Sequence, residues 1–390
     1  MQFHEFPLAD LTSRVQETLG PLEKWVDRAY WDIANPPQVT IGYGVNLSGS
    51  KTYLRLVLER VYGAGVLNID GFVDAFSDAI RTIQPTTEQV IANSRDWNDI
   101  LRTGLDGLIG QYLLPGQTFQ PLQVNEPLAA EIERNILEGF TLLNGEVERG
   151  VYSQLDGLLE HHQVIVPRNT NEYVALVSLY YNGKPKEYDA LGQVIKHNLV
   201  GSKLLTALKT ENRAEAWYEI RYNSNANGIH ANRRYTESDL FGLFENTQTT
   251  EPEAKAIYRM YTAHRETILR YEQDFPPSAA ISNRAATNPG PSRTFYDESF
   301  VARNLLFTNY ATFTGAPAIN GEVLVGSDLQ RDTFDLQPVS IPGVPAHVFD
   351  LSKNDLMFGE GGDDFLRGRG GVDVLYGGAG DDRLVKRRAA

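Results

Sequence analysis

Residues 23–44, EKWVDRAYWDIANPPQVTIGYG, combine two acidic side chains with a short strand that glycines interrupt. The apolar residues before this stretch recur at helical spacing, and Gly20-Pro21 is expected to end that helix just before Glu23. Residues 35–37 predict a turn, and the β-branched residues 39–41 predict a strand that ends at the following glycines. The stretch therefore predicts a helix end, then a turn, then a hairpin.

Glu23 and Asp32 are the acidic pair that suggests a chemistry for this stretch. Hydrolysis of a glycosidic bond uses one carboxylic acid to protonate the leaving oxygen and a second carboxylate as base or nucleophile. On spacing alone, a Glu and an Asp nine residues apart are more often two solvated carboxylates than a catalytic pair. The motif around the two residues decides between these interpretations.

Glu, then Tyr-x-Asp, then Thr-Ile-Gly-Tyr-Gly resembles the phage-type lysozyme family, the T4-like muramidases and endolysins of glycoside hydrolase family 24. The resemblance implies that Glu23 is the general acid, that Asp32 positions or activates the attacking water, and that Thr40 lines the site beside them. Two features depart from the family: Lys24 stands where a glycine is common, and the gap from Asp32 to Thr40 is longer. A related branch carries its aspartate where this chain has Asn46, so Asn46 is expected close to the site.

Residues 175–244 hold a second block of resemblance to the same family. The segments ALVSLYYNGK, LLTALKTENRAEAWYEIRYN and GIHANRRYTESDLF resemble, in order, its helix with an aromatic-Asn-x-Gly end, two short helices, and a last basic helix. In the family a basic residue of that last helix pairs with the catalytic Glu, which falls on Arg233 here, with Arg234 second and Asn182 as a supporting residue. The alternative is a turn asparagine and two solvated helix charges.

The remaining N-terminal chain predicts mainly helices. Periodic apolar residues indicate helices over 53–62, 71–83, 86–114 with a break, 128–143 and 146–159, a helical elaboration over about 50–165. A further amphipathic helix is expected over 253–274. Residues 276–294 have the composition of a linker, and 295–349 have β character.

Three successive nonapeptides, GEGGDDFLR, GRGGVDVLY and GGAGDDRLV, fill residues 359–385, and residues 350–358 form a degenerate fourth copy. The glycines permit a tight turn, the aspartate at position six presents its carboxylate across that turn, and the apolar residue at position eight points into a parallel β-roll. The pattern resembles the RTX calcium-binding repeat. Two nonapeptides form one coil, so we expect Asp364 to share a Ca²⁺ with Asp382, and Asp355 with Asp373. The alternative is a disordered tail rich in glycine and aspartate.

Composition excludes several classes of function. The 390 residues contain no cysteine, which excludes disulfides and thiol catalysis. A formal net charge of −14 argues against nucleic acid as the main partner. No apolar run is long enough to span a membrane, and the first residues lack the pattern of a Sec signal peptide. No His-Glu-x-x-His or Gly-x-Ser-x-Gly motif supports a zinc protease or a lipase.

Together these observations predict an α+β, mostly α, lysozyme-like domain over 1–275, the linker 276–294, the β-rich connecting segment 295–349, and an RTX parallel β-roll over 350–390. The implied activity is that of an inverting muramidase, which cleaves the β-1,4 bond between N-acetylmuramic acid and N-acetylglucosamine in bacterial peptidoglycan. Ca²⁺ is expected as a structural ion, with no cofactor for catalysis. RTX proteins leave the cell through type I secretion machinery, so we expect a secreted protein without a Sec signal, and an immunity protein is a further partner to test. The alternative is a non-catalytic, calcium-dependent protein that binds the cell surface.

Overall fold

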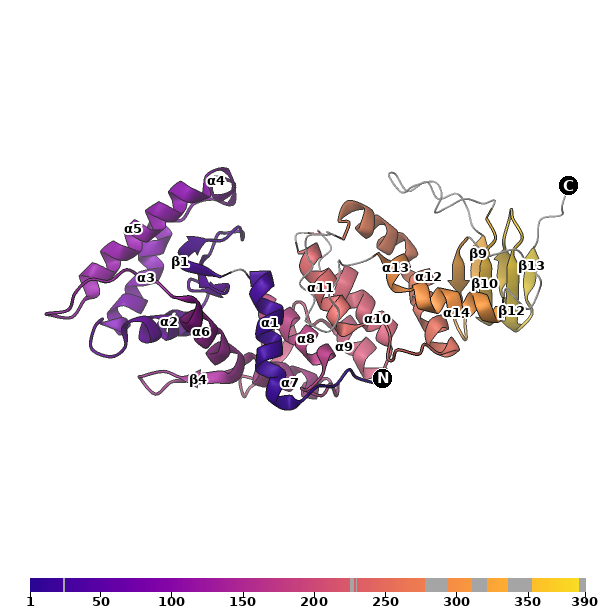
Figure 1. Ribbon diagram of the computed structural model, residues 1–390, viewed down its shortest axis with the longest axis horizontal. Coiled ribbons are helices and arrows are strands. Elements are labelled where there is room, and N and C mark those ends of the chain that lie inside the picture. The colour runs from indigo at the N-terminus through magenta and orange to yellow at the C-terminus, as the bar shows by residue number, and fades with distance from the viewer. Residues whose placement is uncertain are drawn as a thin grey trace.

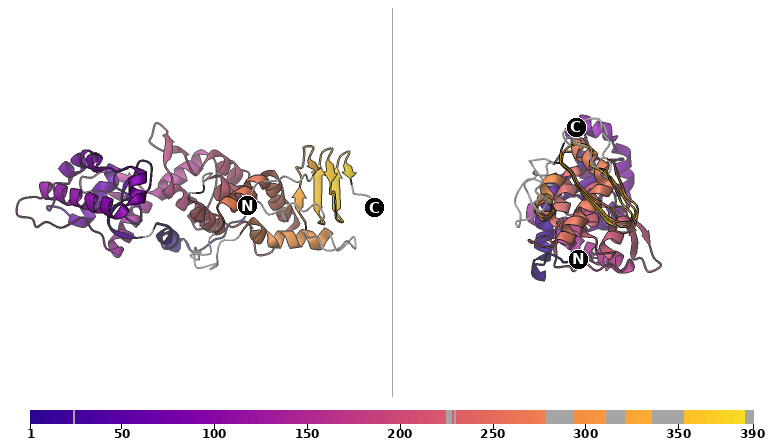
Figure 2. Two further views of the ribbon diagram at one scale, coloured as in Figure 1. Left: turned by 90° about the horizontal axis from the view of Figure 1, so that it is seen from above. Right: turned by 90° about the vertical axis from the view of Figure 1, so that its right-hand side faces the viewer.

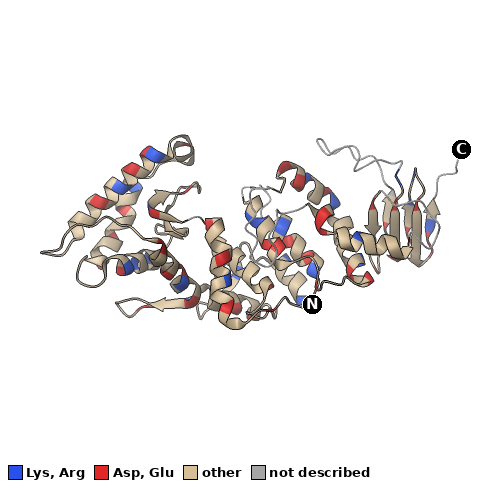
Figure 3. Cartoon of the chain, in the orientation of Figure 1, with Lys and Arg blue, Asp and Glu red and all other residues tan. Residues whose placement is uncertain are grey.

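The computed structural model describes residues 1–23, 25–224, 228, 230–277, 294–310, 321–335 and 353–385. The molecule is elongated and has two lobes, followed by a group of helices and a stack of strands (Figure 1). One continuous core of buried apolar side chains runs through both lobes and the helices that follow, and a small second core lies inside the stack of strands. Acidic and basic side chains are interspersed along the helices of both lobes (Figure 3).

The first lobe is built on a three-stranded antiparallel sheet of order β1-β2-β3. Tyr30 on β1 lies opposite Thr40 on β2, and Thr40 lies opposite Asn46 on β3, which confirms the predicted hairpin. Helix α5 packs against β1. The elements are β1 (Val26–Trp31), β2 (Val39–Gly42), β3 (Val45–Asn46), α2 (Lys51–Tyr62), α3 (Ile69–Ile83), α4 (Thr87–Ala92), α5 (Ser94–Tyr112), α6 (Glu126–Glu138), β4 (Gly139–Thr141) and β5 (Val147–Arg149).

The second lobe surrounds α8, whose residues are buried on almost every side. Thr170 caps α8, because its hydroxyl accepts a hydrogen bond from the backbone N–H of Tyr173 at 3.2 Å. Helix α1 packs against both α8 and α6, and so joins the two lobes. The elements are η1 (Leu8–Asp10), α1 (Leu11–Glu23), α7 (Val151–His161), α8 (Asn171–Asn182), β6 (Pro185–Tyr188), β7 (Val194–His197), α9 (Ser202–Lys209), α10 (Arg213–Tyr218), η2 (Glu219–Asn223) and α11 (Ala231–Phe241).

The helical pattern predicted over 50–165 is largely confirmed, with one difference, and a second prediction, for the first helix, is wrong. Residues 139–149 form the β4–β5 hairpin in place of helix, because Gly139 has a φ of 97° and ends α6 there. The expectation that Gly20-Pro21 ends the first helix is wrong, since α1 continues through Pro21 to Glu23. Pro21 removes one backbone N–H donor from the last turn, and the helix ends two residues beyond it.

Three helices follow the second lobe: α12 (Glu251–Asp274), α13 (Phe295–Glu298) and α14 (Phe300–Tyr310). The β character predicted for 295–313 is wrong over 295–310. Thr294 and Asp297 form a capping box that starts α13, and Phe295, Ala302 and Leu306 are buried. Helix α14 packs on α12, so tertiary contact outweighs the strand preference of this aromatic and β-branched sequence. Of the predicted linker, 278–293 lie outside the described residues.

Six short strands form a parallel β-roll, as the repeats predict. Two three-stranded parallel sheets, of order β12-β10-β8 and β13-β11-β9, face each other, and their coils superimpose when viewed along the long axis of the molecule (Figure 2). Leu324, Met357, Leu366 and Leu375 fill the interior. The strands are β8 (Val323–Val325), β9 (Thr333–Asp335), β10 (Leu356–Gly361), β11 (Phe365–Arg367), β12 (Val374–Ala379) and β13 (Arg383–Val385).

The roll begins earlier than its predicted start at residue 350. Val323 pairs with Leu356, and Thr333 pairs with Phe365, so β8 and β9 form the first coil of the same roll. The segment predicted as a separate β-rich connection over 295–349 is therefore two helices followed by the first coil, with 311–320 and 336–349 outside the described residues. The aligned hydrogen bonds of parallel strands make this coil continuous with the repeats.

Candidate functional site

Glu23 forms an ion pair with Arg233, although the two residues are 210 positions apart in the sequence. Arg233 Nη1 donates to Glu23 Oε1, its Nε donates to Glu237 Oε1 at 3.1 Å, and its Nη2 donates to the carbonyl oxygen of Ser178 at 3.1 Å. Burial alone would lower the pKa of Arg233, but the carboxylates of Glu23 and Glu237 raise it above its ordinary value. A fixed cation from α11 therefore orients the carboxyl group at the end of α1.

Asp32 follows the last residue of β1 and has a carboxylate with two distinct roles. Its Oδ1 accepts hydrogen bonds from the backbone N–H groups of Ala34 and Gln38, each at 2.9 Å, and so shapes the turn between β1 and β2. Its Oδ2 accepts from the hydroxyl of Thr40 at 3.3 Å. The turn holds the carboxylate still, and one of its oxygens faces the buried threonine of β2.

Tyr30 on β1 is affected by the charges of both Glu23 and Asp32. Burial and, to a smaller extent, the negative charges of Glu23 and Asp32 together raise the pKa of the Tyr30 hydroxyl to about 12. Both carboxylates therefore act on the same side chain, which lies opposite Thr40 in the sheet. The motif of residues 23–44 contains this tyrosine, but no separate role was predicted for it.

Gly44 explains why the predicted strand motif contains glycines. Its φ is +75°, and a Cβ atom at this position would lie 2.4 Å from Oε2 of Glu23. The hairpin can therefore approach the carboxyl group closely only because residue 44 has no side chain. Asn46, expected near the site, lies opposite Thr40 and accepts a hydrogen bond from the backbone N–H of Gly49 at 2.7 Å.

Arg234 and Asn182 lie behind the pair of Glu23 and Arg233. Arg234 Nη2 donates to Asn182 Oδ1 at 2.7 Å, and Nη1 of the same residue donates to Glu237. Burial lowers the pKa of Arg234. Arg233 and Arg234 are both buried, so the alternative that they are solvated helix charges is wrong. Arg233 contacts Glu23 directly, and Arg234 supports the shared partner Glu237.

Glu133 is an acidic residue near the site that the sequence did not indicate. It lies on α6, is 1% exposed, and accepts a hydrogen bond from Gln16 Nε2 at 3.3 Å through Oε2. Its Oε1 has no hydrogen-bond partner within the described part of the chain. Burial raises the pKa of Glu133 against the opposing hydrogen bond from Gln16, and with a smaller contribution from the charge of Glu23 the pKa is about 7. A second, buried carboxyl group therefore interacts electrostatically with Glu23.

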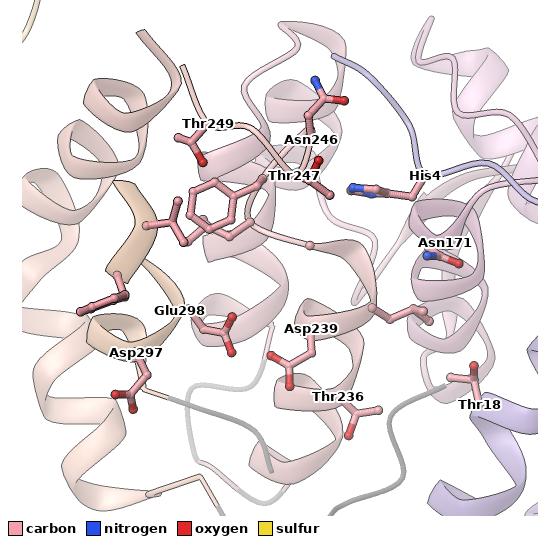
Figure 4. A pocket seen from close by; sticks show the side chains of 16 residues that line it. His4, Thr18, Asn171, Thr236, Asp239, Asn246, Thr247, Thr249, Asp297 and Glu298 are labelled. Carbon is pink, nitrogen blue, oxygen red and sulfur yellow. The ribbon is translucent and has the colours of Figure 1, made fainter. Parts of the chain in front are cut away.

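A cavity of about 790 Å³ lies elsewhere in the molecule, beside the second lobe (Figure 4). His4 and Asn171 line one side of it, Asp297 and Glu298 line another, and Asp239 lies between them. It contains none of the residues predicted for the catalytic or calcium sites. This cavity is therefore separate from the arrangement around Glu23.

The four aspartates predicted to bind calcium stack in pairs 18 residues apart. The N–H of Asp355 donates to Asp373 Oδ1 at 3.1 Å, and the N–H of Asp364 donates to Asp382 Oδ1 at 3.0 Å. In each of the three regular repeats, the aspartate at position six also lies against the first glycine of the same repeat. A Cβ atom at Gly359, for example, would lie 2.3 Å from Asp364 Oδ2. The stacking predicted from the nine-residue period is confirmed.

These turns fit a calcium ion on the chemistry of their oxygens. Oδ2 of Asp355 and Oδ2 of Asp364 are buried and have no hydrogen-bond partner among the described residues. Burial raises the pKa of Asp355 to about 7, with a further contribution from Asp373. No group of three or more acidic or histidine side chains in the described chain is placed to bind a metal, so an ion here would take two carboxylates and backbone carbonyl oxygens. Ca²⁺ suits such an all-oxygen set of ligands.

Two parallel sheets joined by glycine-rich acidic turns define the C-terminal part as a β-roll of the calcium-binding class. A family model for the RTX calcium-binding nonapeptide repeat matches residues 351–384 in four copies, so this part of the chain consists of RTX repeats that bind calcium. A search of curated proteins found no match to the chain, and neither did a search of solved structures. Among the helices of the described residues, none combines the length and the apolar character needed to cross a bilayer.

Proposed function

We propose that the two lobes form a muramidase, which hydrolyses the β-1,4 bond between N-acetylmuramic acid and N-acetylglucosamine in peptidoglycan. The observation that supports it most is the ion pair of Glu23 with Arg233, which joins the two separate blocks of sequence that resemble phage-type lysozymes. The hydrogen bond from Thr40 to Asp32 adds a second pair of residues expected from the same resemblance. Four residues predicted to act together are therefore in contact as two pairs.

Glu23 is the general acid of this proposal. Arg233 holds Oε1, and Oε2 lies at the hairpin beside Gly44, so the carboxyl group has a fixed direction. Proton transfer to the leaving oxygen in the transition state requires such a positioned group and contributes roughly 10²–10⁴-fold to a rate. The side chain is 16% exposed, so part of it is accessible to a substrate.

Asp32 and Thr40 position the attacking water. The carboxylate is held by two backbone N–H groups, which leaves Oδ2 and the threonine hydroxyl as neighbouring groups for a water molecule. In an inverting glycosidase the two carboxyl groups stand roughly 6.5–9.5 Å apart, which leaves room for that water on the opposite face of the sugar. The resemblance to phage-type lysozymes implies inversion, so the expected product is the anomer of opposite configuration.

The RTX repeats support an extracellular site of action. Calcium modules of extracellular proteins bind the ion with dissociation constants of about 10⁻⁴–10⁻³ M, so the roll would fold in the calcium concentrations found outside cells. In the low calcium concentration inside a cell the roll would stay unfolded, and export by type I secretion machinery is consistent with folding only after export. A producer that exports this enzyme would require an immunity protein if its own wall were accessible to it.

The decisive experiment compares Glu23→Gln with the wild type on purified, dye-labelled peptidoglycan, with and without calcium. We expect the variant to lose at least 10²-fold in dye release, whereas Glu17→Gln, an exposed carboxylate on the same helix, should retain activity. Mass spectrometry of the released muropeptides identifies the bond that is cut. Retained activity in Glu23→Gln contradicts the assignment, and an inactive wild type favours the calcium-dependent surface-binding protein.

A further inference from the structure

Four ionisable residues follow one face of α11 from its N-terminal end. They are His230, Arg233, Arg234 and Glu237, at relative positions i, i+3, i+4 and i+7. Side chains with this spacing are neighbours on the surface of a helix. Helical hydrogen bonding begins at His230, because its carbonyl oxygen accepts from the N–H of Arg234 at 3.0 Å. The face of α11 that provides Arg233 to Glu23 therefore begins with a histidine.

Accessibility along this face increases toward the start of the helix. Glu237 and Arg234 are fully buried, Arg233 is 7% exposed, and His230 is exposed to solvent. The guanidinium groups of Arg233 and Arg234 are also engaged, since they donate to Glu23 and to Glu237. His230 is therefore the residue of this face that a ligand can contact when it approaches Glu23 from solvent.

The electrostatic environment of His230 includes the proposed acid. Burial lowers the pKa of His230, and the positive charges of Arg234 and Arg233 lower it further, whereas the carboxylates of Glu237 and Glu23 oppose this change. The charge of Glu23 acts from the end of α1 and the other three act from α11. A pKa below the ordinary value keeps the imidazole neutral at pH 7, so one ring nitrogen donates a hydrogen bond and the other accepts one.

His230 does not serve α11 as a capping residue. It occupies the N-cap position, where Ser, Thr, Asp and Asn are favoured because their side chains accept a hydrogen bond from the first turn. The side chain of His230 makes no such capping bond. The stability of α11 therefore gives no reason for a histidine at this position, and its replacement should leave the helix intact.

We propose that His230 is a substrate-binding residue, whose imidazole forms a hydrogen bond with a hydroxyl or N-acetyl group of the glycan held against Glu23. The inference rests on the proposed function, because the muramidase activity defines a glycan as the ligand. Hydroxyl and amide groups both donate and accept, so either matches a neutral imidazole. Asp32 and Thr40 belong to the first lobe and His230 to the second, so the glycan would be contacted from both lobes.

The test is the affinity of the full chain for soluble, peptide-free glycan strands of alternating N-acetylglucosamine and N-acetylmuramic acid. Isothermal titration calorimetry at pH 7.5 and constant calcium uses the Glu23→Gln chain, which does not degrade the strands. Adding His230→Ala should weaken binding roughly 3- to 10-fold, the range expected for one lost neutral hydrogen bond. His230→Gln, which keeps a donor and an acceptor, should recover most of the affinity.

Asn232→Ala is the matched control, because Asn232 is exposed on the same first turn but lies two positions from His230 and so on another face. It should bind the strands as tightly as the Glu23→Gln chain. In the chain with Glu23 intact, His230→Ala should raise KM for dye-labelled peptidoglycan by a similar factor, with a smaller change in kcat. Its midpoint of unfolding in urea should equal that of the wild type.

Unchanged affinity in His230→Ala overturns the proposal, as does an equal loss in Asn232→Ala, which would indicate a disturbed helix. Failure of His230→Gln to bind more tightly than His230→Ala overturns the proposed hydrogen bond. A wild type that binds the strands without cleaving them refutes the muramidase activity alone, since weaker binding by His230→Ala would still identify the contact. Absence of any binding by the Glu23→Gln chain overturns the inference directly.

Discussion

Replacing Glu133 with glutamine should remove a pH-dependent loss of stability from the first lobe. The carboxyl group is 1% exposed and its pKa is about 7 in the folded chain, against an ordinary value of 4.5. Because the pKa of Glu133 is higher in the folded chain, its protonated form stabilises the fold. This contribution to the free energy of unfolding is fully present below pH 4.5 and is lost as the pH rises through about 7. The difference corresponds to about 3 kcal/mol of unfolding free energy at pH 8.

The measurement is the free energy of unfolding by urea, followed by tryptophan fluorescence, at several pH values between 4.5 and 8 in constant calcium. We expect Glu133→Gln to gain about 3 kcal/mol relative to the wild type over this range. Glu131→Gln, on the same helix with a side chain that is 54% exposed, should change by less than about 0.5 kcal/mol. A difference between Glu133→Gln and the wild type that stays constant with pH would refute the reasoning.

Two further substitutions test the hairpin and the joint between the lobes. Gly44→Ala should abolish hydrolysis, because its Cβ would lie 2.4 Å from the carboxyl group of the proposed acid, whereas Gly63→Ala, with a similar φ of +66° and open space around it, should keep activity in the same dye-release assay. Tyr181→Phe removes the hydrogen bond of 3.1 Å to the carbonyl oxygen of Tyr43, and should cost about 1 kcal/mol in urea unfolding; an unchanged midpoint would show that this bond does not stabilise the chain.

Much of the site around Glu23 was predictable because its residues belong to local motifs. The motif of residues 23–44 and the basic helix with Arg233 can each be recognised from a few neighbouring residues. In the structure the two segments are in contact through the ion pair of Glu23 with Arg233. Whether the complete N-terminal fold is that of a lysozyme stays a prediction. The buried carboxyl of Glu133 was not predictable, since its environment arises from packing of α6 against other elements, which no sequence period encodes.

The extent of the roll shows a different reason for a missed prediction. In the regular repeats Gly359 and Asp364 are five positions apart, whereas Gly326 and Asp332 of the first coil are six apart. One extra residue breaks the nine-residue period, yet a turn can absorb it while the strands on both sides keep their pairing. Periodicity therefore detected the regular coils and missed the one that connects them to the helices.

The strand order of the roll places its first coil against the helices and its later coils progressively farther from them. β8 packs on α12, and β10 and β12 follow in sequence order away from the lobes. Each further pair of nonapeptides would add its strands beyond β12 and β13, and its stability would depend mainly on the coil before it. Evolution or protein engineering can therefore vary the length of this module, and with it the number of bound ions, without altering the surfaces that hold Glu23 and Arg233.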